Sequence, residues 1–214
     1  MERLGILASH FDDLEQQREA SRLGMWIFLG TEIMFFGGLF LTYTVYRFTY
    51  ADAFADASAH LDLMLGAINT IVLITSSLTM ALSVYGAECG RRKAVVGFLF
   101  TTIALGTIFL GIKAIEYGHK FSEHFVPGSR FAYPEATYSQ HAELFFSLYF
   151  AMTGMHALHM IIGVGVLFVL VFQAWKGKFS PVYYAPVELT GLYWHFVDII
   201  WIFLFPLLYL IRGR

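Results

Sequence analysis

The stretch "GLYWHFVDIIWIFLF", from Gly191 to Phe205, is a wall of aromatic and aliphatic side chains that holds two ionisable ones, His195 and Asp198. It belongs to an apolar segment long enough for a membrane-spanning helix, which needs about 20 residues to cross ~30 Å of hydrocarbon. Four other segments of this kind precede it. The sequence therefore predicts an all-α integral-membrane bundle of five transmembrane helices, at residues 23–46, 63–86, 94–116, 142–172 and 187–211.

The composition agrees with a membrane protein. Of the 214 residues 57% are hydrophobic and 14% are charged, whereas about one quarter of an ordinary soluble domain is charged. The formal charge of -2 offers no basic face to replace the counterions of phosphates, which excludes nucleic acid as a partner. The single cysteine, Cys89, excludes a disulfide or a cysteine metal site within the chain.

The connections between the predicted helices are short, so we expect one five-helix membrane domain over residues 23–211. The segment 1–22 is acidic and polar and lacks the basic-then-apolar order of a cleaved signal, so it is interpreted as a mature, amphipathic cytoplasmic segment. Lys and Arg are more frequent near the helix ends on the N-terminal side, which predicts a cytoplasmic N-terminus. No fixed-period repeat is found, which argues against a solenoid or an inverted-repeat transporter.

Glu32 is the first ionisable residue predicted at membrane depth, nine residues after Leu23 and so about 13 Å along the helix axis. Its neighbours one turn away are apolar, and burial in hydrocarbon favours a neutral carboxylic acid. Two interpretations stay open: a protonated Glu that donates to a backbone carbonyl, or a residue that handles protons or lies at an interface. Gly30 and Gly37 fall on the opposite side of the helix, where close helix packing is possible.

Two i,i+3 pairs follow. Lys113 and Glu116 can neutralise each other near the membrane interface, where the lysine could extend to the headgroups. His156 and His159 lie on one side of their helix, where they either bind a metal or haem or hydrogen-bond across the bundle. The bonding across the bundle is favoured because a lone HxxH lacks the carboxylates of di-iron helix bundles.

The last helix carries a polar stripe of Glu188, His195 and Asp198. An ionised Asp198 beside a protonated His195 would be net neutral, and the flanking Tyr and Trp side chains could donate hydrogen bonds to a carboxylate. The remaining candidate ligands are expected to be solvated at loops or helix ends: His119, His124 and His141.

Five stretches together resemble a known family. They are "LGMWIFLGTEIMFFGGLF", "INTIVLITSS", "KAIEYGHKF", "MTGMHALHMIIG" and "VELTGLYWHFVDIIWIFLF", and they occur in the order and spacing seen in subunit III of the haem-copper cytochrome c oxidases. The resemblance runs from Arg22 to Tyr209. It implies an all-helical membrane subunit that binds no metal, haem or copper of its own and packs directly against subunit I, beside subunit II, in an oxidase that reduces oxygen to water and pumps protons.

The resemblance also implies roles for individual residues. Glu32 matches the intramembrane carboxylate of the family that reacts with hydrophobic carbodiimide. Arg91 matches a basic position that could hold a lipid phosphate. Bound phospholipid, support of proton uptake into subunit I and protection of the oxidase during turnover are further expectations. The other matching positions are Asn69, Glu116, His156, His159, Glu188, Trp194, His195 and Asp198.

Long members of the family have seven helices, and this chain begins where their third helix would. The missing pair is either fused to subunit I or absent, so a deep lipid cleft within this chain is not expected. A five-helix chain resembles the subunits found in bacterial oxidases, in which cytochrome c or quinol supplies the electrons. This resemblance implies that the protein lies in a bacterial plasma membrane. The alternatives are an accessory subunit of nitric oxide reductase, a membrane metalloenzyme that uses carboxylates together with His156, His159 and His195, and a small transporter that uses Glu32 and the polar stripe.

Overall fold

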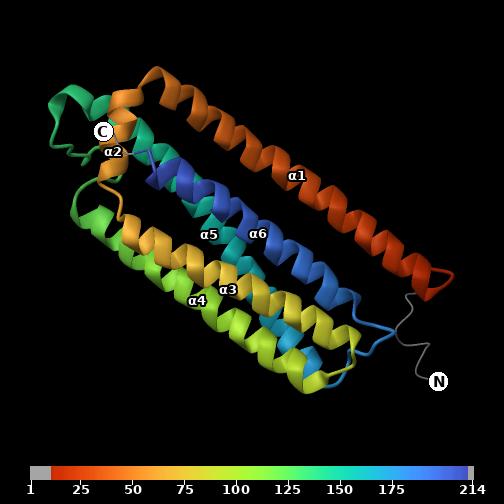
Figure 1. Ribbon diagram of the computed structural model, residues 1–214. Helices are drawn as coiled ribbons and strands as arrows, with labels where there is room; N and C mark the ends of the chain where they lie inside the picture. Colours follow the sequence, from red (N-terminus) through yellow and green to blue (C-terminus); the bar gives the residue numbers. More distant parts are fainter. Residues whose placement is uncertain (1–10, 212–214) are drawn as a thin grey trace.

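The computed structural model describes residues 11–211, and every regular element named in this range is helical (Figure 1). Five helices are long and apolar enough to cross a membrane, which confirms the predicted all-α bundle of five transmembrane helices. The elements are α1 (Leu14–Thr49), α2 (Ala51–Ala59), α3 (Leu63–Glu88), α4 (Arg92–Ser122), the short 3-10 helix η2 (Ala136–Tyr138), α5 (Ser139–Trp175) and α6 (Ala185–Tyr209).

The predicted start of the first helix is wrong. Asp13 caps α1 by accepting a hydrogen bond from the backbone N–H of Gln16 at 2.7 Å, as N-terminal capping residues do. Residues 14–22 are therefore the first turns of a 36-residue helix that continues into the predicted span. Residues 1–10 of that segment lie outside the described range.

Helix α2 lies in the connection between the spans predicted at 23–46 and 63–86. It follows α1 directly and buries Phe54, which packs edge-on against Phe145 of α5 with ring centroids 5.4 Å apart. The buried Ser58 hydroxyl donates to the Leu208 carbonyl near the end of α6 at 2.7 Å. These contacts hold α2, which connects α1 to α3, against the ends of α5 and α6.

Helix α6 is the central element of the bundle. In Figure 1 it lies between α1 and α3, with α5 alongside. In the most apolar part of α6, 56% of the residues are buried inside the bundle. In the corresponding part of α1 only 11% are buried, so α1 is the most exposed span. Apart from α1's own backbone, no atom of residues 11–211 lies within 4 Å of a Cβ added at Gly30 or Gly37, so no other helix of the described chain packs closely on these glycines.

Two other glycines set the helix spacing. Trp194 of α6 is fully buried. A Cβ atom at Gly106 of α4 would lie 2.9 Å from the Trp194 ring, and one at Gly163 of α5 would also lie 2.9 Å from it. The indole is therefore enclosed by glycine positions on two helices, which lets α4, α5 and α6 approach closely.

Candidate functional site

Glu32 pairs with a histidine of another helix. Its Oε2 atom lies 3.1 Å from Nε2 of His159, which places the pair between α1 and α5. The side chains are 18% and 11% exposed, so the pair is reachable from the membrane side. The expectation that Glu32 donates to a backbone carbonyl is wrong, because its partner is an imidazole.

His159 is held in place by its own helix. Its Nδ1 atom lies 2.8 Å from the Met155 carbonyl oxygen, a geometry in which Nδ1 carries the proton and Nε2 faces Glu32. Tyr193 of α6 donates its hydroxyl proton to the His159 carbonyl at 2.9 Å, and Phe36 packs against the ring. The position of the imidazole is thus determined by α1, α5 and α6 together.

His156 does not share this site, although it is one turn away. Its ring packs against Phe109 and Trp201, with centroids 5.4 Å and 5.3 Å away. It is 1% exposed, and neither ring nitrogen has a hydrogen-bond partner among residues 11–211. The favoured expectation of bonding across the bundle therefore holds for His159 and is wrong for His156.

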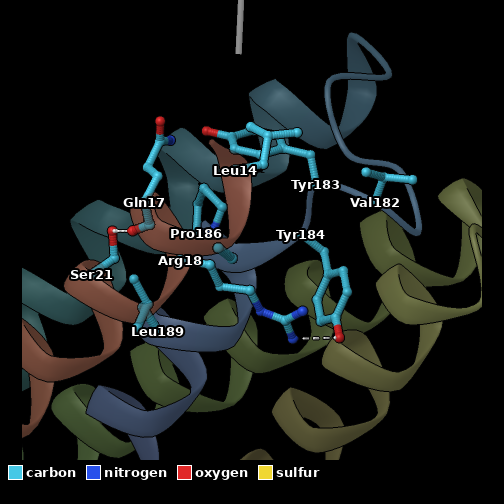
Figure 2. Close-up of a pocket in the computed structure, with 10 residues that line it drawn as sticks. Leu14, Gln17, Arg18, Ser21, Val182, Tyr183, Tyr184, Pro186 and Leu189 are labelled. Carbon is cyan, nitrogen blue, oxygen red and sulfur yellow. Dashed lines mark hydrogen bonds between the residues drawn. The ribbon is translucent and has the colours of Figure 1, made fainter. Parts of the chain in front are cut away.

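The predicted stripe on α6 separates into three environments. Glu188, at its cytoplasmic end in the predicted topology, pairs with Arg22 and lies 3.3 Å from Arg18, both on α1. Arg18 also donates to the Tyr184 hydroxyl at 2.9 Å, as Figure 2 shows beside a small pocket at this end of the bundle. Glu188 thus joins α6 to α1 through ion pairs and is not part of a buried polar network with His195 and Asp198.

His195 and Asp198 do not pair with each other. The Nδ1 atom of His195 lies 2.7 Å from the Ser77 hydroxyl of α3. Asp198 is 3% exposed, and both its carboxyl oxygens lack a hydrogen-bond partner among the described residues. The expected neutral His–Asp pair is therefore wrong.

The flanking aromatic donors also serve other partners. Trp194 donates to the Ser76 hydroxyl and Trp201 to the Thr70 hydroxyl, each at 3.1 Å, and Tyr193 donates to a backbone carbonyl. None of them reaches a carboxylate, so this part of the predicted stripe is wrong. They connect α6 to α3 and α5 instead.

Lys113 and Glu116 form the predicted ion pair, at 3.0 Å, but far more deeply than expected. They are 3% and 1% exposed, so the lysine does not extend to the headgroups. Tyr149 and Tyr209 donate to Glu116 Oε1 at 2.8 Å and 2.5 Å. The pair is a fully hydrogen-bonded cluster that joins α4, α5 and α6.

The other polar candidates lie at the ends of the helices. Arg91 is exposed and stands directly before α4, where its side chain is accessible to a headgroup. His119 and His124 are exposed as expected. His141 is partly buried and stacks on Tyr50 with ring centroids 3.9 Å apart, so its predicted solvation is only partial.

The His, Cys, Asp and Glu side chains are the possible ligands of a metal or haem. Within residues 11–211 no group of three or more His, Cys, Asp and Glu side chains converges on one point. Both nitrogens of His159 are engaged, and those of His156 face aromatic rings. The described residues therefore do not fit a metal centre built on these histidines.

Sequence reasoning missed the partners that come from other helices. Arg18 and Arg22 were placed in a polar segment, although their i,i+4 spacing puts both on one face of a helix. Ser77 ends the matching stretch "INTIVLITSS". No sequence signal connects it to His195, 118 residues away.

These features define the class: a helical membrane protein with five spans, whose helices are joined by ion pairs such as Arg22–Glu188 and Glu32–His159. The family model for cytochrome c oxidase subunit III matches residues 12–212. The cytochrome c oxidase subunit 3 of Alkalihalophilus pseudofirmus is 30% identical over 205 residues, which cover 95% of this chain and 93% of that protein.

Two further relatives agree over most of both chains. The cytochrome c oxidase subunit 3 of Corynebacterium diphtheriae is 33% identical over 89% of this chain and 87% of its own length. The quinol oxidase subunit 3 of Bacillus subtilis is 32% identical, with 92% and 91% covered. The chain belongs to the cytochrome c oxidase subunit III family. It is a membrane subunit of a respiratory terminal oxidase, and other oxidase subunits are its partners.

Proposed function

We propose that this chain is a non-catalytic subunit, which stabilises the catalytic subunit I by direct contact and supports proton uptake into it. The haem and copper would then reside in the partner subunits. The engagement of His159, Glu116 and Glu188 with other side chains of the chain supports this, because none of them is left available as a redox ligand. The arrangement proposed has a cytoplasmic N-terminus in a bacterial plasma membrane.

The observation that carries the proton-handling role is the Glu32–His159 contact. A carboxyl group and an imidazole 3.1 Å apart hold one proton between them. The pair is neutral whether the proton lies on oxygen or on nitrogen, so it is tolerated at membrane depth. Both side chains are partly exposed, so the pair is accessible to a proton donor or acceptor.

Bound lipid is part of the proposal. Arg91 and Arg92 stand at the α3–α4 connection, the end of the bundle that is cytoplasmic in the proposed topology. Arg92 already donates to the Ala174 carbonyl at 3.1 Å, whereas the exposed Arg91 can contact a phospholipid phosphate. This site is at a different depth from Glu32, so the two roles are separable by mutation.

Carbodiimide labelling of the purified oxidase tests Glu32. We expect the wild-type subunit to be labelled at Glu32 and the Glu32→Ala variant not at all, because the equally intramembrane Glu116 is enclosed by Lys113 and two tyrosines. Haem content and electron transfer should stay near the wild-type level. Labelled sites are identified by mass spectrometry of the digested subunit.

Proton uptake tests the role of the pair. Glu32→Gln and His159→Phe should each slow proton uptake during turnover or shorten the active lifetime of the oxidase. The buried His156→Phe serves as the control of the same chemistry one turn away. If Glu32→Gln leaves uptake and lifetime unchanged, or if labelling continues in Glu32→Ala, the pair has only a packing role.

A further inference from the structure

The Glu32–His159 pair has four atoms that could carry a proton, two on the carboxyl group and two on the imidazole ring. Three of them are engaged within the chain. Oε2 of Glu32 and Nε2 of His159 face each other at 3.1 Å, and Nδ1 of His159 lies 2.8 Å from the Met155 carbonyl oxygen. The fourth atom, Oε1 of Glu32, has no hydrogen-bond partner within residues 11–211.

Oε1 of Glu32 is not covered by the chain. The Glu32 side chain is 18% exposed. Within the described range, buried side-chain atoms without a hydrogen-bond partner occur in Asn69, Ser83, His156 and Asp198, and Oε1 of Glu32 is not among them. Since α1 is also the most exposed span, a group outside this chain can reach Oε1, whereas the other three atoms are occupied.

The imidazole ring of His159 offers no exit for a proton on its far side. Its Nδ1–H group donates to a backbone carbonyl, which accepts a hydrogen bond but does not pass a proton on. His156, one turn away on α5, lies between the rings of Phe109 and Trp201, and neither of its nitrogens has a partner within residues 11–211. In this part of the chain no hydrogen-bonded series of ionisable side chains leads from His159 into the bundle.

Tyr193 faces the pair from α6. Its hydroxyl group donates to the His159 carbonyl at 2.9 Å, so its proton is committed to the backbone. Its ring lies near that of Phe28 of α1, one turn before Glu32, with centroids 6.1 Å apart. Among residues 11–211, no other carboxyl or imidazole group of α1 or α6 hydrogen-bonds to the pair.

We propose that the Glu32–His159 pair is a terminal proton-storage site, whose proton enters and leaves through Oε1 of Glu32 alone. The shared proton moves fully onto the carboxyl group, and a half-turn of this group about its last torsion, which has no sharp preference, carries the proton to the outer side. A water molecule there accepts it and becomes hydronium, which leaves a carboxylate and a neutral imidazole. Uptake is the reverse reaction.

Exchange at this depth requires water beside the chain. Glu32 lies about 13 Å inside the predicted span, and acyl chains carry no group that exchanges protons. The water is therefore held where another oxidase subunit covers this face, and the pair stores protons for that partner. This inference rests on the proposed proton-handling role and adds the route that the proton takes.

Hydrogen–deuterium exchange at the Glu32 carboxyl group tests this route. It is followed by infrared spectroscopy of the intact oxidase after transfer into heavy water, and the Glu32 band is identified as the carboxyl band that is lost in Glu32→Gln. In His159→Gln the side-chain amide still donates to Oε2 but passes no proton on. We expect this variant to exchange within about threefold of the wild-type rate, because Oε1 is unchanged.

His156→Phe is the matched variant one turn away on α5, and its exchange should stay within the same range. Slower exchange in either variant would show that protons reach Glu32 through α5. That result would overturn the terminal site and leave the proton-handling role of the pair intact. If the wild-type oxidase has no carboxyl band that depends on Glu32, both proposals fail. Should His159→Gln not assemble, His156→Phe decides the route alone.

Discussion

The variant Lys113→Met is expected to lose about 3–5 kcal/mol of stability, because removing one partner of a buried ion pair leaves the other charge uncompensated. Lys113 lies 3.0 Å from Glu116 and also donates to Tyr149 and Tyr209, at 3.1 Å and 3.0 Å. The loss would be seen as a lower amount of the subunit in membranes and as a lower unfolding temperature of the purified oxidase.

The double variant Lys113→Met/Glu116→Gln separates the charge effect from a packing effect. Glutamine is neutral and keeps an oxygen that accepts from Tyr149 and Tyr209, so the double variant should be clearly more stable than Lys113→Met alone. If the double variant is as unstable as the sum of the two single variants, the ion pair is not what stabilises this cluster.

The variant Gly163→Ala is the second change with a large expected effect. Its methyl group would lie 2.9 Å from the Trp194 ring, and the indole cannot move freely because its N–H donates to Ser76. Overpacking of this kind costs about 1–3 kcal/mol. Thermal unfolding of the purified oxidase, followed by release of this subunit, would measure it.

Gly165→Ala is the matched control on the same helix. Apart from the backbone of its own helix and its chain neighbours, no atom of residues 11–211 lies within 4 Å of the methyl group it would add. The substitution should therefore be neutral or stabilise the helix by up to ~1 kcal/mol. Equal effects of the two substitutions would show that the contact with Trp194 does not set the helix spacing.

The five spans could be predicted because the length of an apolar run is a property of the sequence alone. The helix α2 could not, since nine residues are too few for a clear pattern. The first turns of α1 are polar, and the acidic group that pairs with their arginines, Glu188, lies 166 residues from Arg22. Their helical structure therefore depends on packing against α6.

In the candidate site, too, contacts within one helix could be predicted from the sequence, whereas contacts between helices could not. Helical spacing placed Lys113 beside Glu116 because both lie on one helix, and that prediction is confirmed. It also placed His195 beside Asp198, but His195 hydrogen-bonds to Ser77 of α3 instead. Spacing tells which residues share a face and not which neighbouring helix faces them, so the Glu32–His159 contact could not be predicted either.

Purification of the tagged chain in a mild detergent tests the central claim, that this chain is an oxidase subunit without redox groups of its own. The reduced-minus-oxidised absorption spectrum of the purified material should show haem, carried by co-purifying partner subunits. After dissociation, the isolated chain should contain neither iron nor copper by metal analysis. Stoichiometric haem, iron or copper retained by the isolated chain, or its purification without any haem-bearing partner, would contradict the account.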